Sequence, residues 1–145
     1  MQKKVTIQIK GTQKYPEGHV DQQELNAVGT YYERNGVFYL VYKECDSQST
    51  ELKGVTTFIT VKDGLVGLNR KGAIDNCQEF SKGVPNRGIY STCFGNIWLS
   101  VMPHLVECDL TVQGGRISLE YDLFVEDNLV SYNVLLLNIK EDSPQ

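Results

Sequence analysis

Residues 114–128 read GGRISLEYDLFVEDN, and this stretch decides the fold class. After the two glycines, one set of side chains alternates with a second set: Ile117, Leu119, Tyr121, Leu123 and Val125 against Ser118, Glu120, Asp122, Phe124 and Glu126. Alternation with a period of two is typical of a strand that buries one face. The stretch ends at Asp127-Asn128, a dipeptide that tolerates the positive φ angles of a tight hairpin. It therefore predicts a half-buried strand between two hairpin turns.

Dipeptides of the same kind recur along the chain and divide apolar-rich runs, at Asn35-Gly36, Asp63-Gly64, Gly95-Asn96 and Gly114-Gly115. No helical periodicity occurs between them. The runs predict strands at residues 5–10, 20–33, 37–42, 52–61, 65–72, 77–80, 89–94, 97–112, 117–126 and 129–140. Gly29 indicates a bulge or a bend within its strand, and Pro103 places its strand at an edge or a bulge.

These strands predict an all-β fold, because short turns connect them and no crossover helix separates them. An antiparallel sheet of this size forms a sandwich or closes into a barrel, and hairpins that follow one another favour a single up-and-down β-barrel of about 8–10 strands. Such a barrel is filled by side chains or holds one small ligand. The length suits one domain over residues 1–141, and residues 142–145 are expected to be a frayed tail.

The net charge of −4 argues against general binding of nucleic acid, which needs a basic face. Residues 69–96 nevertheless carry a net charge of +2, which suits a small anionic ligand. The chain shows neither an apolar run long enough for a membrane helix nor a signal-peptide pattern, so we expect a cytoplasmic protein without membrane contact. The four cysteines form no close pair, and we expect reduced thiols that fill small apolar positions.

Several short blocks along the chain resemble the DUF1934 family of small bacterial proteins. The longest block has three parts: Arg70-Lys71-Gly72, Phe80 with Gly83, and Tyr90-Ser91-Thr92 followed by Phe94-Gly95. Val5-Thr6-Ile7 and Gly29-Thr30-Tyr31-Tyr32 are also similar to it. The resemblance spans nearly the whole chain and rests on the order and spacing of the blocks. One position departs from it, because Cys93 stands where a proline is expected.

The resemblance implies a calycin-like β-barrel, related in shape to lipocalins and fatty-acid-binding proteins. It implies no activity, because the family is functionally uncharacterised. The resemblance therefore predicts the fold, and only the individual residues can indicate the function.

The candidate ligand-binding residues are Arg70, Tyr90, Thr92, Trp98 and Tyr121. Arg70 and Lys71 lie in a strand-like segment, where alternation sends neighbouring side chains to opposite faces. One of them therefore points into the barrel, where a cation needs either an acid or a bound anion. Tyr90 and Thr92 share one strand face and offer hydroxyl donors. Trp98 and Tyr121 either orient a ligand or pack in a filled interior.

The familiar catalytic and cofactor motifs are absent from the sequence. Gly67 to Gly72 has the glycine spacing of a phosphate-binding loop, but Ala73-Ile74 follows where lysine and a hydroxyl residue are required. His19 and His104 are the only histidines, and neither belongs to an HExxH motif. We therefore predict no catalytic residue, no metal and no cofactor, and we do not favour an enzyme.

Three functions compete. The first is a barrel that binds a small, partly apolar or anionic ligand. The second is an interaction or dimerisation module with a filled barrel, in which the strand Val37 to Tyr42, apolar on both faces, joins two copies. The third is an enzyme at the barrel mouth, which requires a histidine joined to a cysteine and a carboxylate.

Overall fold

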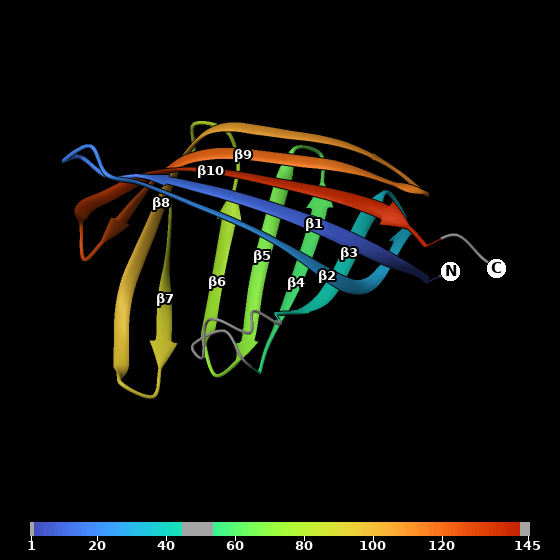
Figure 1. The fold of residues 1–145 in the computed structure, drawn as a ribbon, viewed down its shortest axis with the longest axis horizontal. Helices are drawn as coiled ribbons and strands as arrows, with labels where there is room; N and C mark the ends of the chain where they lie inside the picture. Colours follow the sequence, from blue (N-terminus) through green and yellow to red (C-terminus); the bar gives the residue numbers. More distant parts are fainter. Residues whose placement is uncertain (1, 45–53, 143–145) are drawn as a thin grey trace.

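The computed structural model describes residues 2–44 and 54–142. Ten strands lie within these ranges: β1 (Lys3–Lys14), β2 (Val20–Arg34), β3 (Val37–Glu44), β4 (Val55–Lys62), β5 (Leu65–Gly72), β6 (Asp75–Phe80), β7 (Asn86–Thr92), β8 (Gly95–Thr111), β9 (Gly114–Val125) and β10 (Asn128–Glu141). Each strand pairs antiparallel with the next, and β1 pairs with β10, so the sheet closes into a barrel (Figure 1). The prediction of an all-β, up-and-down antiparallel barrel is confirmed. The described residues contain no helix long and apolar enough to cross a membrane.

The alternation read from the sequence decides which side chains fill the barrel. Ile117 and Leu119 are each 1% exposed, as their strand pattern predicts, and Val5 and Ile7 are fully buried. The buried core comprises Val5, Ile7, Ala27, Tyr31, Leu40, Tyr42, Ile59, Val61, Val66, Leu68, Phe80, Val101, Ile117, Leu119, Leu137 and Ile139. Apolar burial of this kind is the main force that stabilises the fold.

Tyr31 joins distant parts of this core. Its side chain is 1% exposed, and its ring stacks on Phe38 with 6.0 Å between centroids. Its hydroxyl donates a 2.6 Å hydrogen bond to the carbonyl of Thr111, at the end of β8. Burial, with a smaller contribution from Glu33, raises the pKa of Tyr31 to about 12. Packing and hydrogen bonding thus hold this side chain neutral inside the barrel.

The hairpin turns differ from the prediction at three places. At Gly95 and Gly114 each glycine follows the turn as the first residue of β8 or β9, and the turns are Cys93-Phe94 and Val112-Gln113. The two glycines have φ angles of 129° and 133°, which explains why glycine is required just after the turn. The last turn is Glu126-Asp127, one residue earlier than expected, and both residues have positive φ.

The strand irregularities predicted at Pro103 and at Gly29 have different outcomes in the structure. The β8–β9 register shifts between Pro103 and Leu105, which confirms the bulge predicted at the proline. At Gly29 the registers with β1 and β3 continue without a shift. A Cβ atom at Gly29 would lie 2.3 Å from the carbonyl oxygen of Val41. This glycine therefore serves a close approach of strands, and the register with β1 shows no bulge there.

The strand Val37 to Tyr42 corresponds to the start of β3. Leu40 and Tyr42 are buried in the core, and Phe38 packs against it. The alternate side chains face outward and are half-buried, with Tyr39 stacked on Tyr32 at 4.7 Å between ring centroids. Only alternate residues of this strand therefore contribute to an outer face.

Three cysteines lie in the described residues, and all three are free thiols. Cys108 is half-buried against the core, and burial raises the pKa of its thiol. Cys77 and Cys93 are exposed, so the expectation that the cysteines fill small apolar positions is wrong for these two. Cys45 lies outside the described residues, as does the stretch from Asp46 to Thr50.

Near the C-terminal end of the barrel, Asp142 remains attached to β1. Its backbone N–H donates to the carbonyl of Lys4 at 3.0 Å, and its carboxylate accepts a 2.7 Å hydrogen bond from the hydroxyl of Thr6. The order of the sheet thus continues one residue beyond β10. The tail predicted to fray comprised residues 142–145; Asp142 is instead bonded to β1, and residues 143–145 lie outside the described residues.

Candidate functional site

The inward faces of the strands carry two rows of polar side chains, each formed by residues directly opposite one another on neighbouring strands. We call the first the arginine row: Thr57, Arg70, Asn76 and Tyr90, on β4 to β7. We call the second the amide row: Asp21, Gln13, Asn133 and Tyr121, on β2, β1, β10 and β9. Cross-strand neighbours lie about 4.5–5.5 Å apart at their Cβ atoms, so each row is a continuous polar strip.

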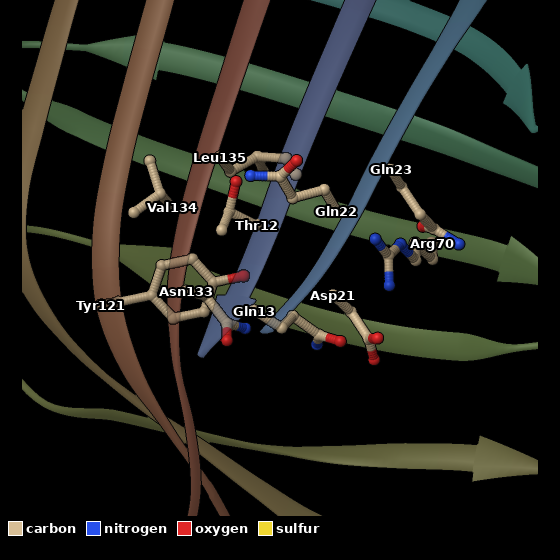
Figure 2. A pocket seen from close by; sticks show the side chains of 11 residues that line it. Thr12, Gln13, Asp21, Gln22, Gln23, Arg70, Tyr121, Asn133, Val134 and Leu135 are labelled. Atoms are coloured by element: carbon tan, nitrogen blue, oxygen red, sulfur yellow. The ribbon is translucent and has the colours of Figure 1, made fainter. Parts of the chain in front are cut away.

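The two rows meet at a pocket of about 390 Å³. Its lining residues are Gly11, Thr12, Gln13, Asp21, Gln22, Gln23, Arg70, Tyr121, Asn133, Val134 and Leu135. Figure 2 shows Tyr121 and Arg70 on opposite sides of the pocket, with Asp21 and Gln13 between them in this view. The pocket thus lies where β1 ends and β2 begins, and Arg70 is its member from the arginine row.

Packing fixes the aromatic side of the pocket. The ring of Tyr121 contacts Phe80 in a tilted arrangement with 4.9 Å between centroids. Beside it, Ser131 donates a 2.7 Å hydrogen bond to Oδ1 of Asn133, and both residues are buried. Because Oδ1 accepts this bond, the Nδ2 group of Asn133 is the donor that the amide presents to the pocket.

The wall that carries the arginine row contains an unusual seam between β6 and β7. Only two residue pairs are in ladder register there, Asp75 with Ser91 and Asn76 with Tyr90. Three side-chain hydrogen bonds also join the strands: Asn76 Nδ2 to the carbonyl of Ile89 at 3.2 Å, Gln78 Nε2 to Asn86 Oδ1 at 3.0 Å, and the N–H of Glu79 to Asn86 Oδ1 at 2.9 Å. Within β6, Asn76 Nδ2 also donates to Gln78 Oε1 at 3.0 Å. Buried amides therefore replace a backbone ladder at this seam.

The negative charge of the pocket comes from Asp21. Its Oδ1 lies 2.8 Å from Nε2 of His19, and the carboxylate is 52% exposed. The His19 ring stacks on Tyr15 at 5.6 Å between centroids. Burial, followed by the charge of Asp21, raises the pKa of Tyr15. These contacts hold Asp21 at the solvent side of the pocket.

The five predicted ligand-binding residues do not form one group. Arg70 and Tyr121 line the pocket. Tyr90 belongs to the arginine row without lining the pocket, and Thr92 lies at the end of the β7–β8 hairpin, where its Oγ1 accepts from the N–H of Phe94 at 3.1 Å. Trp98 is on the outer surface, with the Arg87 guanidinium 4.3 Å from its ring centroid. The pocket therefore contains only two of the five predicted residues.

The sequence reasoning missed Gln13, Asp21 and Asn133. A signal for Gln13 was present, because the alternation of Val5, Ile7 and Ile9 continues inward to residue 13. For Asn133 the signal was a polar residue within an apolar strand. Nothing in the sequence placed Asp21 opposite Gln13.

A second polar cluster lies on the outer surface at the Pro103 bulge. His104 Nε2 is 2.8 Å from Asp122 Oδ2, its ring stacks on Tyr132, and the Tyr132 hydroxyl donates to Glu120. The bond to Glu120, followed by burial, raises the pKa of Tyr132 to about 12. No three histidine, cysteine, aspartate or glutamate side chains come together as a metal site in the part of the chain that the structure describes.

Comparison with known proteins gives relatives for this barrel. A protein of Bacillus subtilis strain 168, the uncharacterized beta-barrel protein YwiB, is 30% identical over 123 residues, which cover 85% of this chain and 83% of that protein. The crystal structure of the ywiB protein from Bacillus subtilis matches with a TM-score of 0.86 and 25% identity, over 98% of this chain and 94% of that chain. A family model described as a domain of unknown function, DUF1934, matches residues 7–137. This β-barrel chain therefore belongs to the DUF1934 family.

Proposed function

We propose that this protein binds a small, partly apolar molecule with an anionic group in the pocket between the two polar rows. The observation that carries the proposal is the position of Arg70 in the lining of a pocket of about 390 Å³. That volume lies within the range of about 300–1,000 Å³ that is usual for small-molecule sites. A concave site with a few convergent polar groups is the expected form of a binding site.

Five of the lining residues have a role in this proposal. The guanidinium of Arg70 binds a carboxylate or phosphate by two parallel hydrogen bonds, a geometry that lysine does not provide. Tyr121 and Asn133 supply a hydroxyl and an amide donor on the other side. Leu135 provides apolar surface, and a Cβ atom at Gly11 would meet only Leu135, at 4.0 Å. The missing side chain at Gly11 thus leaves room for the apolar part of a ligand.

The test is native mass spectrometry of protein purified without detergent or chelator. We expect the wild type to carry the added mass of one small molecule and Arg70→Ala to lose it, because the substitution removes the cation of the pocket. Arg116→Ala is the matched control: Arg116 is an exposed arginine whose Nε donates to Asn138 at 3.2 Å, away from the pocket. It should retain the added mass.

An added mass that survives Arg70→Ala would place the ligand elsewhere and contradict the proposal. A bare wild-type mass, together with no thermal stabilisation by small carboxylates, phosphates or amino acids at millimolar concentration, would contradict it as well, because a ligand that binds only the folded state raises the unfolding temperature. Thermal unfolding of Arg70→Ala without ligand separates lost binding from lost folding.

A second candidate function is self-association through the β7–β8 hairpin, which Figure 1 shows projecting at one side of the barrel. Phe94 at its turn is 95% exposed, and Ile89 and Trp98, directly opposite each other, are 45% and 40% exposed. At the edge of this patch, Nη2 of Arg87 lies 3.9 Å from Oδ2 of Asp127, and both side chains are accessible. The patch presents one positive and one negative side chain beside its apolar residues, so it is self-complementary and a second copy is the partner that fits.

We expect sedimentation velocity to show a dimer that Phe94→Ser disrupts, because the substitution removes the most exposed apolar side chain of the patch. Val112→Ser is the control, since Val112 is 58% exposed at a different turn. A wild type that stays monomeric at all concentrations, or a dimer equally weakened by both substitutions, rejects this candidate.

A further inference from the structure

The pocket carries one group of each charge. Arg70 contributes a guanidinium and Asp21 a carboxylate, and no other charged residue belongs to its lining in the described part of the chain. In the view of Figure 2, Asp21 lies between Gln13 and Arg70. The charge pattern of the pocket is therefore balanced, whereas the sequence had indicated only a cation.

This balance discriminates between classes of ligand. A simple anion gains from Arg70 but is repelled by Asp21, and like charges brought together at a binding site weaken the complex. A simple amine gains from Asp21 but is repelled by Arg70. A molecule with both an ammonium and a carboxylate gains from both side chains, and its own two charges are matched rather than opposed.

We infer that the ligand is a zwitterion, an α-amino acid, held by its carboxylate on Arg70 and by its ammonium on Asp21. The inference rests on the proposed function and names its ligand class. Guanidinium has five N–H donors, so contacts of Arg70 within the protein are compatible with a ligand carboxylate. The Nε2 atom of His19 at 2.8 Å from Oδ1 of Asp21 orients the carboxylate at the pocket mouth.

The rest of the lining suits this ligand. Amide side chains supply donors and acceptors in equal number, and the pocket holds four: Gln13, Gln22, Gln23 and Asn133. Such groups satisfy an ammonium and a carboxylate equally well. Leu135, beside the open space at Gly11, receives the side chain of the amino acid.

The experiment uses the full chain and has two steps. Thermal unfolding is first recorded with each of the common amino acids at millimolar concentration. The most stabilising amino acid is then compared by isothermal titration calorimetry with its two truncated analogues, the acid without the amino group and the amine without the carboxyl group. For leucine these are 4-methylpentanoate and 3-methylbutylamine. We expect the amino acid to bind at least about tenfold more tightly than either analogue.

Asp21→Asn makes the charge assignment directly testable. We expect it to weaken amino-acid binding by about tenfold or more, and to strengthen binding of the analogue without the amino group, because the repulsion is removed. Asp63→Asn is the control, since Asp63 lies in the β4–β5 turn away from the pocket and adopts a φ of 49°, which asparagine tolerates. It should change neither affinity.

Two results overturn the inference while leaving the proposed function intact. One is an analogue without the amino group that binds as tightly as the amino acid. The other is Arg70-dependent added mass in the native spectrum together with no stabilisation by any amino acid. Absence of both the added mass and any stabilisation overturns the inference and the proposed function together.

Discussion

Tyr31→Ala is expected to lower the free energy of unfolding by about 3–5 kcal/mol, the usual cost of truncating a buried aromatic side chain. Tyr31 is 1% exposed, its ring stacks on Phe38, and its hydroxyl bonds the carbonyl of Thr111. The substitution leaves a cavity in the core and an unpaired carbonyl at the end of β8. Urea unfolding followed by circular dichroism measures the effect.

Tyr31→Phe is the matched variant, because it keeps the ring and removes only the hydrogen bond. At neutral pH we expect a loss of about 1 kcal/mol. The folded pKa of Tyr31, about 12, lies above the ordinary value of 10.0, so the stability it gives is complete below pH 10 and is lost as the pH rises towards 12. The wild type should therefore lose about 1.4 kcal/mol per pH unit relative to Tyr31→Phe in that range. Equal stability of Tyr31→Ala and the wild type would contradict the packing described here.

Gly88→Ala is expected to destabilise the barrel by about 2–3 kcal/mol, near the upper end of the cost of overpacking. A Cβ atom at Gly88 would lie 2.4 Å from the carbonyl oxygen of Cys77 and 2.9 Å from Oε1 of Gln78. Because the first of these is a backbone atom, β6 and β7 must separate. The seam has only two ladder pairs to resist that separation, and the amide contacts of Gln78 and Asn86 are lost with it.

Gly11→Ala is the control for Gly88→Ala. Both glycines lie in strands, but a Cβ atom at Gly11 meets only Leu135, at 4.0 Å. Its free energy of unfolding should change by less than about 1 kcal/mol, because the Cβ meets no close atom and alanine loses less backbone freedom on folding. A Gly88→Ala variant as stable as Gly11→Ala would show that the seam is not tightly packed.

The fold was predictable because its signals are local. Alternation at Ile117 and Leu119 depends only on near neighbours in the chain, and the buried face follows from it. The turns at Gly95 and Gly114 were displaced because glycine marks a positive φ without saying whether that residue lies in the turn or just after it. The sequence pattern is the same in both cases.

The site was only partly predictable because its geometry depends on barrel closure. Arg70 and Tyr121 were among the predicted residues and line the pocket, although alternation alone left open whether Arg70 or Lys71 points inward. Gln13 meets Asn133 only through the β1–β10 register, which joins the two ends of the chain. No local pattern specifies that register. Trp98 lies between Ile97 and Leu99, which are also apolar, so the sequence pattern did not reveal which face it occupies.

A ¹H–¹⁵N NMR titration of the full chain with the amino acid that stabilises it most tests whether a small ligand occupies the pocket between the two polar rows. We expect the largest shifts on the amide signals of Gln13, Asp21, Arg70, Tyr121 and Asn133, and we expect Arg70→Ala to abolish them. Largest shifts on the β7–β8 hairpin, or none on either polar row at saturating ligand, would contradict ligand binding in the pocket.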